Sequence, residues 1–62
     1  MRYVADFISA VKARQAEIAH SLAVGGAPTH EVYLRLVGEH AGLERSLEIL
    51  NNLLKEEEED DR

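Results

Sequence analysis

Residues 33–54 read YLRLVGEHAGLERSLEILNNLL. Alternate steps of three and four residues along this stretch reach an apolar or aromatic side chain at every position except His40. A repeat of this kind, kept for three heptads, is typical of a helix that packs along its length against another helix. The seam of this helix consists of Tyr33, Leu36, His40, Leu43, Leu47, Leu50 and Leu54.

The segment before this stretch carries a second seam, with steps of four and three residues. Alanine, the strongest helix former, fills many of its remaining positions. We therefore expect an all-α protein, with one helix from about Arg2 to Val24 and another from about Thr29 to Glu56. The seam of the first helix consists of Val4, Ile8, Val11, Gln15, Ile18 and Leu22.

Residues 25–28 have the composition of a tight loop between the two helices. Gly25 can end the first helix in the left-handed conformation, Pro28 prevents the helix from continuing, and Thr29 can cap the second helix. A loop this short makes the two helices antiparallel neighbours. Residues 1–55 are therefore predicted to form one antiparallel two-helix hairpin.

The hairpin register follows from the position of the loop. If the chain folds back near residue 27, the numbers of opposing residues add up to about 55. This register places Arg14 beside Glu39 and Lys12 beside Glu44, and both pairs have opposite charges. Charge pairs that flank a helical seam favour one register over another.

The same register places Gln15 opposite His40, so the polar members of the two seams fall in one layer. A polar layer of this kind can determine register and oligomeric state. It can also act as a pH switch, because imidazole titrates near neutrality. The switch hypothesis predicts weaker assembly near about pH 5.5 than at about pH 8.

A hairpin of 62 residues has one buried face, and its apolar burial roughly balances an ordering entropy of about 1.5 kcal/mol per residue. The chain has no cysteine for disulfides, and a zinc site without cysteine is uncommon in structural roles. We therefore expect self-association, most simply into a dimeric four-helix bundle. The predicted oligomer interface consists of Tyr3, Phe7, Val32, Gly38, Gly42, Ile49, Leu53 and Leu54. Its glycines either permit close helix approach or are merely tolerated within a packed helix.

The net charge of −5 comes from the C-terminal end, because residues 1–55 carry equal numbers of acidic and basic side chains. Residues 56–62 form an acidic tail that we expect to be disordered at its end. The tail is a candidate binding segment for a basic protein partner. Its acidic residues are Glu56, Glu57, Glu58, Glu59, Asp60 and Asp61.

No apolar run approaches the roughly 18 residues of a membrane span, and the N-terminus lacks the layout of a signal peptide. The expected location is therefore the cytoplasm.

The candidates for chemistry are few. Glu17 and His20 have the Glu-x-x-His spacing of metal-binding helical bundles, but this spacing places both outside the core stripe. His20, Thr29 and His30 flank the loop without further convergent groups. No nucleophile-and-base arrangement or phosphate loop is present. We therefore expect a non-enzymatic protein without cofactors.

The length, the helical hairpin, the polar layer and the acidic tail resemble the architecture of the Rop-type plasmid copy-number proteins. That resemblance implies a dimeric four-helix bundle that binds paired RNA hairpins. Residues 33–38 (YLRLVG), 42–43 (GL) and 49–54 (ILNNLL), followed by an acidic end, are similar to small helical proteins of tailed bacteriophages and prophages. This second resemblance implies an accessory or assembly role in a phage.

Together these features favour a small homo-oligomeric interaction protein that serves as a scaffold, adaptor or inhibitor. An RNA-binding four-helix bundle is the alternative, although Lys12 and Arg14 lie on opposite flanks of the first seam. A metal-binding bundle is the third possibility.

Overall fold

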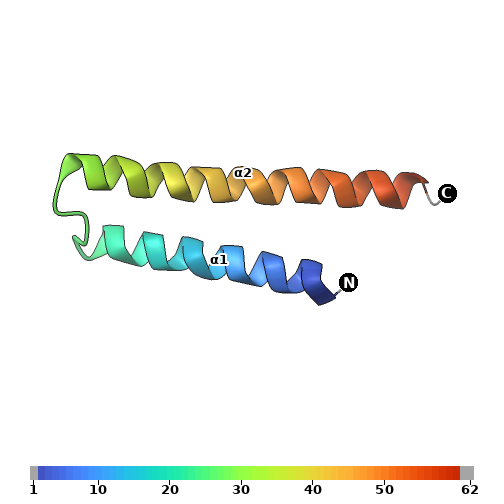
Figure 1. Cartoon of the computed structure of the whole chain (residues 1–62), viewed down its shortest axis with the longest axis horizontal. Coiled ribbons are helices and arrows are strands. Elements are labelled where there is room, and N and C mark those ends of the chain that lie inside the picture. Colours follow the sequence, from blue (N-terminus) through green and yellow to red (C-terminus); the bar gives the residue numbers. More distant parts are fainter. Residues whose placement is uncertain (1, 61–62) are drawn as a thin grey trace.

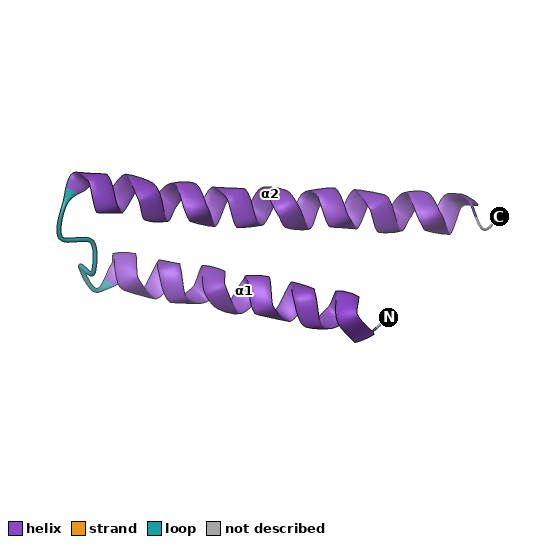
Figure 2. Cartoon of the chain, in the orientation of Figure 1, coloured by secondary structure: helices purple, strands orange, loops and turns teal. Residues whose placement is uncertain are grey.

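The chain is a hairpin of two antiparallel helices (Figure 1). A computed structural model describes the backbone of residues 2–60 and the side chains of residues 2–57. Over that range it contains helix α1, Arg2–Ala23, helix α2, His30–Asp60, and no strand. Figure 2 shows that the connecting loop lies at one end of the rod. The predicted all-α class and the two-helix arrangement are confirmed.

The end of α1 is a Schellman motif, which the glycines make possible. Gly25 has a φ of 76°, and its N–H donates to the Leu22 carbonyl at 3.4 Å. The N–H of Gly26 donates to the Ser21 carbonyl at 2.6 Å. A Cβ at Gly26 would lie 2.9 Å from the same carbonyl oxygen, so no side chain fits there without a shift. Both bonds satisfy carbonyl groups that the helix end would otherwise leave free.

Gly25→Ala is therefore expected to lower the free energy of unfolding by about 1 kcal/mol, because alanine is strained in the left-handed region. Gly38→Ala is the matched control, since a Cβ at this helical position meets no atom within 4 Å beyond the backbone of its own helix turn. The control should raise stability by about the same amount. Thermal unfolding followed by circular dichroism measures both, and equal midpoints for Gly25→Ala and the parent chain would contradict the prediction.

The start of α2 is capped by Thr29. Its Oγ1 accepts a hydrogen bond from the Val32 N–H at 3.1 Å, and its carbonyl accepts one from the Tyr33 N–H at 3.0 Å. Glu31 lies in the first turn, where the helix dipole favours an anion. Local signals therefore determine where the second helix begins.

Helix α2 extends to Asp60, four residues past the end predicted from the sequence, so residues 57–60 are helical rather than part of an irregular tail. Glutamate is a good helix former, and no glycine or proline follows Leu43. The unfavourable effect of acidic residues on the helix dipole is small and screened by solvent. The predicted disorder at the end of the tail falls on residues 61–62, which lie outside the described range. Because α2 is longer than α1, it extends past the N-terminal end of α1 (Figure 1).

The core of the hairpin is small. Among the described side chains, Val11, Gln15 and Ile18 are buried, with exposed fractions of 7%, 9% and 1%. The other members of the predicted core are half-buried, with one exception. These half-buried residues are Val4, Ile8, Leu22, Leu36, His40, Leu43, Leu47 and Leu50.

Tyr33 is the exception, and its assignment to the core was wrong. Its side chain is 46% exposed in the second turn of α2. The ring stacks on His30, with the two centroids 6.1 Å apart and the planes at 16°. Helix α1 ends at Ala23, so few side chains of α1 lie close enough to the loop to cover Tyr33.

The hairpin is a rod of 51 × 19 × 13 Å with a radius of gyration of 15.0 Å. A compact globular chain of this length would have a radius of gyration of about 11 Å. Two helices side by side have no third layer, so most side chains remain in contact with solvent.

Candidate interaction surface

The two flanks of the hairpin seam are different surfaces. Successive helical residues turn by about 100°, so Arg14 and Lys12 fall on opposite sides of the α1 seam. We call the side that carries Arg14 and Glu39 the ion-pair face. We call the side that carries Lys12, Ala19, Val37 and Ala41, with neighbouring residues of both helices, the groove face. The two faces lead to different chemistry.

On the ion-pair face, the Arg14 guanidinium binds the Glu39 carboxylate with two hydrogen bonds. Arg14 Nε donates to Oε2 at 2.5 Å, and Nη2 donates to Oε1 at 3.0 Å. This bidentate pair joins α1 to α2 across the seam, and the sequence register predicts it. The hydrogen bond and the charge of Arg14 lower the pKa of Glu39 from its usual value of about 4.5, and Glu39 in turn raises the pKa of Arg14.

This ion pair makes the free energy of unfolding depend on pH in the acidic range. Because the pKa of Glu39 is lower in the folded chain, its stabilising contribution is present above about pH 4.5 and is lost as the pH falls below that value. Arg14→Gln should therefore lower the thermal midpoint at pH 6 and have a smaller effect at the acid end of the titration. Arg45→Gln is the control for loss of one cation, since Arg45 pairs with Glu48 within α2 at 3.1 Å. An Arg14→Gln effect of the same size at both ends of the titration would contradict the prediction.

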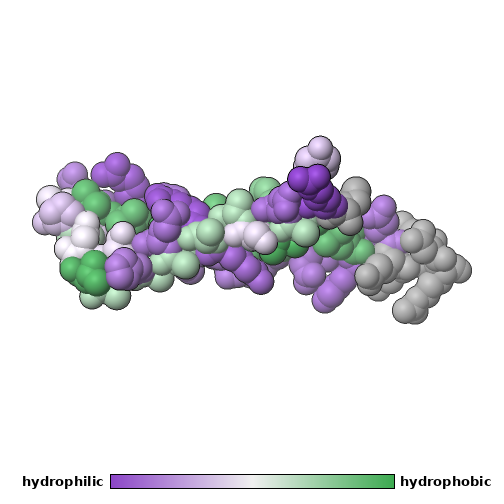
Figure 3. All heavy atoms as spheres, turned by 90° about the horizontal axis from the view of Figure 1, so that it is seen from below, coloured by the Kyte–Doolittle hydropathy of each residue, from purple (hydrophilic) through white to green (hydrophobic). Residues whose placement is uncertain are grey.

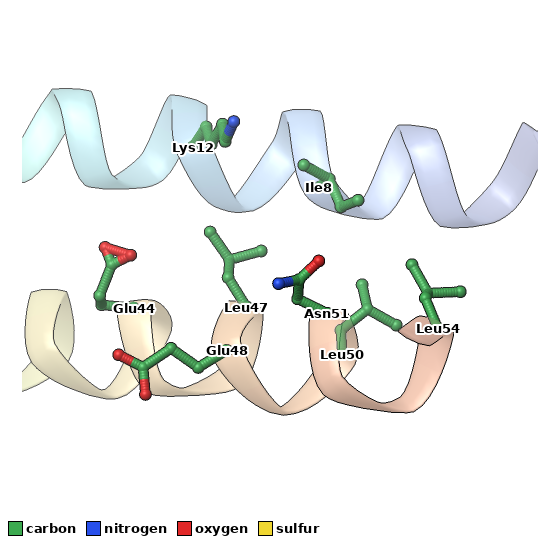
Figure 4. A pocket seen from close by; sticks show the side chains of 8 residues that line it. All are labelled: Ile8, Lys12, Glu44, Leu47, Glu48, Leu50, Asn51 and Leu54. Atoms are coloured by element: carbon green, nitrogen blue, oxygen red, sulfur yellow. The ribbon is translucent and has the colours of Figure 1, made fainter. Parts of the chain in front are cut away.

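On the groove face, the seam is open at the end away from the loop. A shallow groove of about 330 Å³ lies between the helices there. In Figure 4, Ile8 of α1 and Leu47 and Leu54 of α2 point toward one another across this space. Leu50 and four polar side chains line the rest of this groove, which we call the open-end groove. The polar side chains are Lys12, Glu44, Glu48 and Asn51.

Lys12 and Glu44 both line the open-end groove, as the sequence register predicts, but these two described residues do not form an ion pair with each other. Figure 4 shows Lys12 on one helix and Glu44 and Glu48 on the other. No ion pair of Lys12 is found among the residues whose side chains are described, so its ammonium can meet a carboxylate from another molecule.

A second groove, the loop-end groove, lies on the groove face nearer the loop. It has a volume of about 280 Å³ and is lined by Ala19, Leu22, Val37, His40 and Ala41. Apart from His40 its walls are apolar. The groove face is thus apolar toward the loop, and toward the opposite end it carries charged side chains beside apolar ones.

The polar layer joins a side chain to the backbone rather than two side chains. Gln15 Nε2 donates to the carbonyl oxygen of His40 at 3.4 Å. The two residues therefore lie in one layer, as the register predicts. The His40 side chain lines the loop-end groove, so its imidazole is not the partner of Gln15.

The residues predicted for an oligomer interface differ in exposure and in the face on which they lie. Phe7 and Leu53 lie on the ion-pair face by helical spacing, and Tyr3 and Ile49 lie next to them. Their exposed fractions are 84% for Tyr3, 47% for Phe7, 50% for Ile49 and 57% for Leu53.

The other predicted interface residues are less prominent. Val32 and Leu54 are half-buried. Beyond the backbone of their own helix turn, Gly38 and Gly42 have no atom within 4 Å of the position of a Cβ. Figure 3 shows hydrophobic residues reaching the surface at several places along the rod, including the loop end.

Three exposed apolar residues, Val24, Leu34 and Val37, lie outside the interface predicted from the sequence. Leu34 is 53% exposed and Val37 is 38% exposed, and with Ala41 they have the spacing of one helical stripe. The signal was present in the sequence as an apolar stripe beside the seam. Its significance could not be inferred from the sequence, because only the structure shows that the seam opens on that side.

The metal candidates lie at the surface. Glu17 and His20 are both exposed on α1, and His30 is exposed at the start of α2. Among the residues described, no three histidine or carboxylate side chains lie close enough together to hold a metal ion.

By helical spacing, the basic side chains of the described residues lie on more than one side of the hairpin, with Lys12 and Arg14 on opposite flanks. Arg2 lies 3.8 Å from Asp6, Arg14 is paired with Glu39, and Arg45 is paired with Glu48. A nucleic-acid interface requires cations grouped along one face.

Within the described residues, neither helix combines the length with the apolar character needed to cross a lipid bilayer. Comparisons of the chain with protein-family models, with curated proteins and with solved structures give no match.

Proposed function

We propose that this chain is a self-associating helical hairpin and acts as a small non-enzymatic interaction protein. The observation that carries the proposal is its exposed area of 5052 Å². A compact monomer of 6.9 kDa would expose about 4,000 Å². The surplus of about 1,000 Å² is close to the share of one partner in a standard protein interface, about 800 Å².

The small core supports the same proposal. Val11 and Ile18 are the buried apolar side chains of the described part, and they offset little of the entropy lost in ordering the chain. Association of a second hairpin would bury the half-exposed leucines of the seams. The oligomer that requires the fewest copies is a dimeric four-helix bundle.

The biological role that fits such a bundle is that of a scaffold, adaptor or inhibitor. Its location would be the cytoplasm, and the resemblance of residues 33–54 to small phage proteins favours a phage-encoded accessory. The acidic residues that follow Lys55 would bind a basic protein partner. RNA binding is less well supported, because the cations are dispersed and three of them are paired with carboxylates.

Light scattering over a concentration series tests self-association. We expect an absolute mass of about twice 6.9 kDa at micromolar concentrations. A fully helical species with the mass of one chain at every concentration would exclude the proposal.

The role of the tail is tested by deleting residues 56–62. The truncated chain should keep its helical signal and its oligomeric mass, and it should bind polylysine more weakly than the full chain at low salt. Binding of polylysine with unchanged affinity would remove the tail from the proposed function.

A further inference from the structure

We propose that the groove face is the surface through which two copies of this chain associate, with the loops of both copies at the same end of the bundle. This inference rests on the self-association proposed above. It adds the face, the partner and the orientation.

The first argument is the state of the seam on each face. On the ion-pair face, Arg14 and Glu39 cross from helix to helix and satisfy each other. On the groove face, the seam opens into the open-end groove and the loop-end groove, and seam residues such as Leu22 and Leu47 line them. A second hairpin on the groove face would cover these side chains directly. A second hairpin on the ion-pair face would meet a closed, charged bridge.

The second argument is shape. In α1, Ala16, Ala19 and Ala23 form a stripe of small residues on the groove face. In α2, Val37 lines the loop-end groove and is exposed, and Leu34 is exposed further round the helix on the same side. Small residues on one helix allow a neighbouring helix with larger residues to approach closely. A copy placed so that α1 of each chain lies over α2 of the other would match small residues to large ones.

The third argument is charge, and it decides the orientation. When both loops lie at the same end, the apolar loop half of each copy meets the apolar half of the other. Lys12 of each copy then lies over Glu44 and Glu48 of the other. When the loops lie at opposite ends, Lys12 approaches its own counterpart, and Leu34 and Val37 meet the charged half of α2. The same-end arrangement is therefore the self-complementary one.

The ion-pair face stays outside this contact. Phe7 and its apolar neighbours on that face would remain exposed in the dimer. They consequently provide a matched control surface on the same molecule.

The choice of face is tested by introducing one glutamate on the groove face and, separately, one on the ion-pair face. Ala19 and Phe7 are both exposed in the hairpin, so a glutamate at either position is compatible with the single chain. Ala19→Glu should raise the dimer dissociation constant at least about 100-fold, because it buries an unpaired carboxylate against the partner. Phe7→Glu should change it less than about 3-fold, as expected for a residue outside the interface.

The orientation is tested with a nitroxide label on Val24→Cys, which is possible because the chain has no cysteine of its own. Val24 is 66% exposed and lies at the loop. Labels on two loops at the same end should be about 20 Å apart, roughly two helix spacings. Loops at opposite ends should place the labels at least about 33 Å apart, the length of the 22 residues of α1.

The outcomes separate this inference from the proposed function. A parent chain that never dimerises overturns both. A dimer that resists Ala19→Glu and is disrupted by Phe7→Glu keeps self-association and overturns the choice of face. A dimer disrupted by Ala19→Glu with distant labels overturns the orientation. Circular dichroism of each variant at high concentration shows whether the hairpin itself has remained helical.

Discussion

Ile18→Ala is expected to unfold most of the chain at 25 °C. Ile18 is 1% exposed, the most completely buried large side chain that the structure describes. Removing its three outer carbons costs about 2 to 5 kcal/mol, because the surrounding helices cannot close the cavity fully. A domain this small has a total stability at or below about 5 kcal/mol, so the loss is comparable to the whole.

The helical circular dichroism signal of Ile18→Ala, measured against temperature and urea, checks this expectation. Ile49→Ala is the matched control, because the same residue type is 50% exposed there. The control should change the free energy of unfolding by less than about 0.5 kcal/mol if position 49 remains at the surface. A variant at position 18 that unfolds together with the parent chain would mean that the hairpin core lies elsewhere.

Gln15→Leu is expected to stabilise the hairpin. Gln15 is 9% exposed, and its amide has one hydrogen bond in the hairpin, of 3.4 Å, to the His40 carbonyl. A bond of that length returns little of the cost of burying an amide. A leucine at this position should raise the free energy of unfolding by about 1 to 2 kcal/mol. The thermal midpoint would rise by roughly 4 to 8 °C for each kcal/mol.

Gln15→Leu should also allow the chain to form more than one oligomeric species. A single polar residue in a helical seam selects register and oligomeric state, so its loss should broaden the distribution of species in sedimentation velocity. His40→Leu is the informative comparison. Because Gln15 bonds to the backbone of His40, this substitution leaves the hydrogen bond possible. A broadened distribution for His40→Leu, with a single species for Gln15→Leu, would assign the selective role to the imidazole instead.

Much of the hairpin could be predicted from short-range patterns. The heptad spacing from Leu36 to Leu54 specifies a helix because the same steps return to one face on every second turn. Gly25 and Thr29 mark the ends of the two helices through backbone conformation and one side-chain bond. The loop length then determines which residues face each other, and Arg14 with Glu39 follows.

Other features could not be predicted from these patterns. The acidic composition after Lys55 indicates a tail, yet α2 continues to Asp60. Composition alone does not show whether helix propensity outweighs the unfavourable helix dipole. Tyr33 continues the heptad but is exposed, because a repeat in one helix carries no information about where the partner helix ends.

The sequence by itself determined the helices, their caps, their antiparallel register and the position of the polar layer. Each depends on neighbours within one or two turns, or on the length of one loop. The tertiary structure alone decided on which side the seam opens. A heptad pattern defines the centre of an apolar stripe, and the residues on its two flanks look alike in composition. Lys12 and Val37 line grooves on one side, and Arg14 and Glu39 close the other. This difference depends on how the two helices and their side chains pack in space.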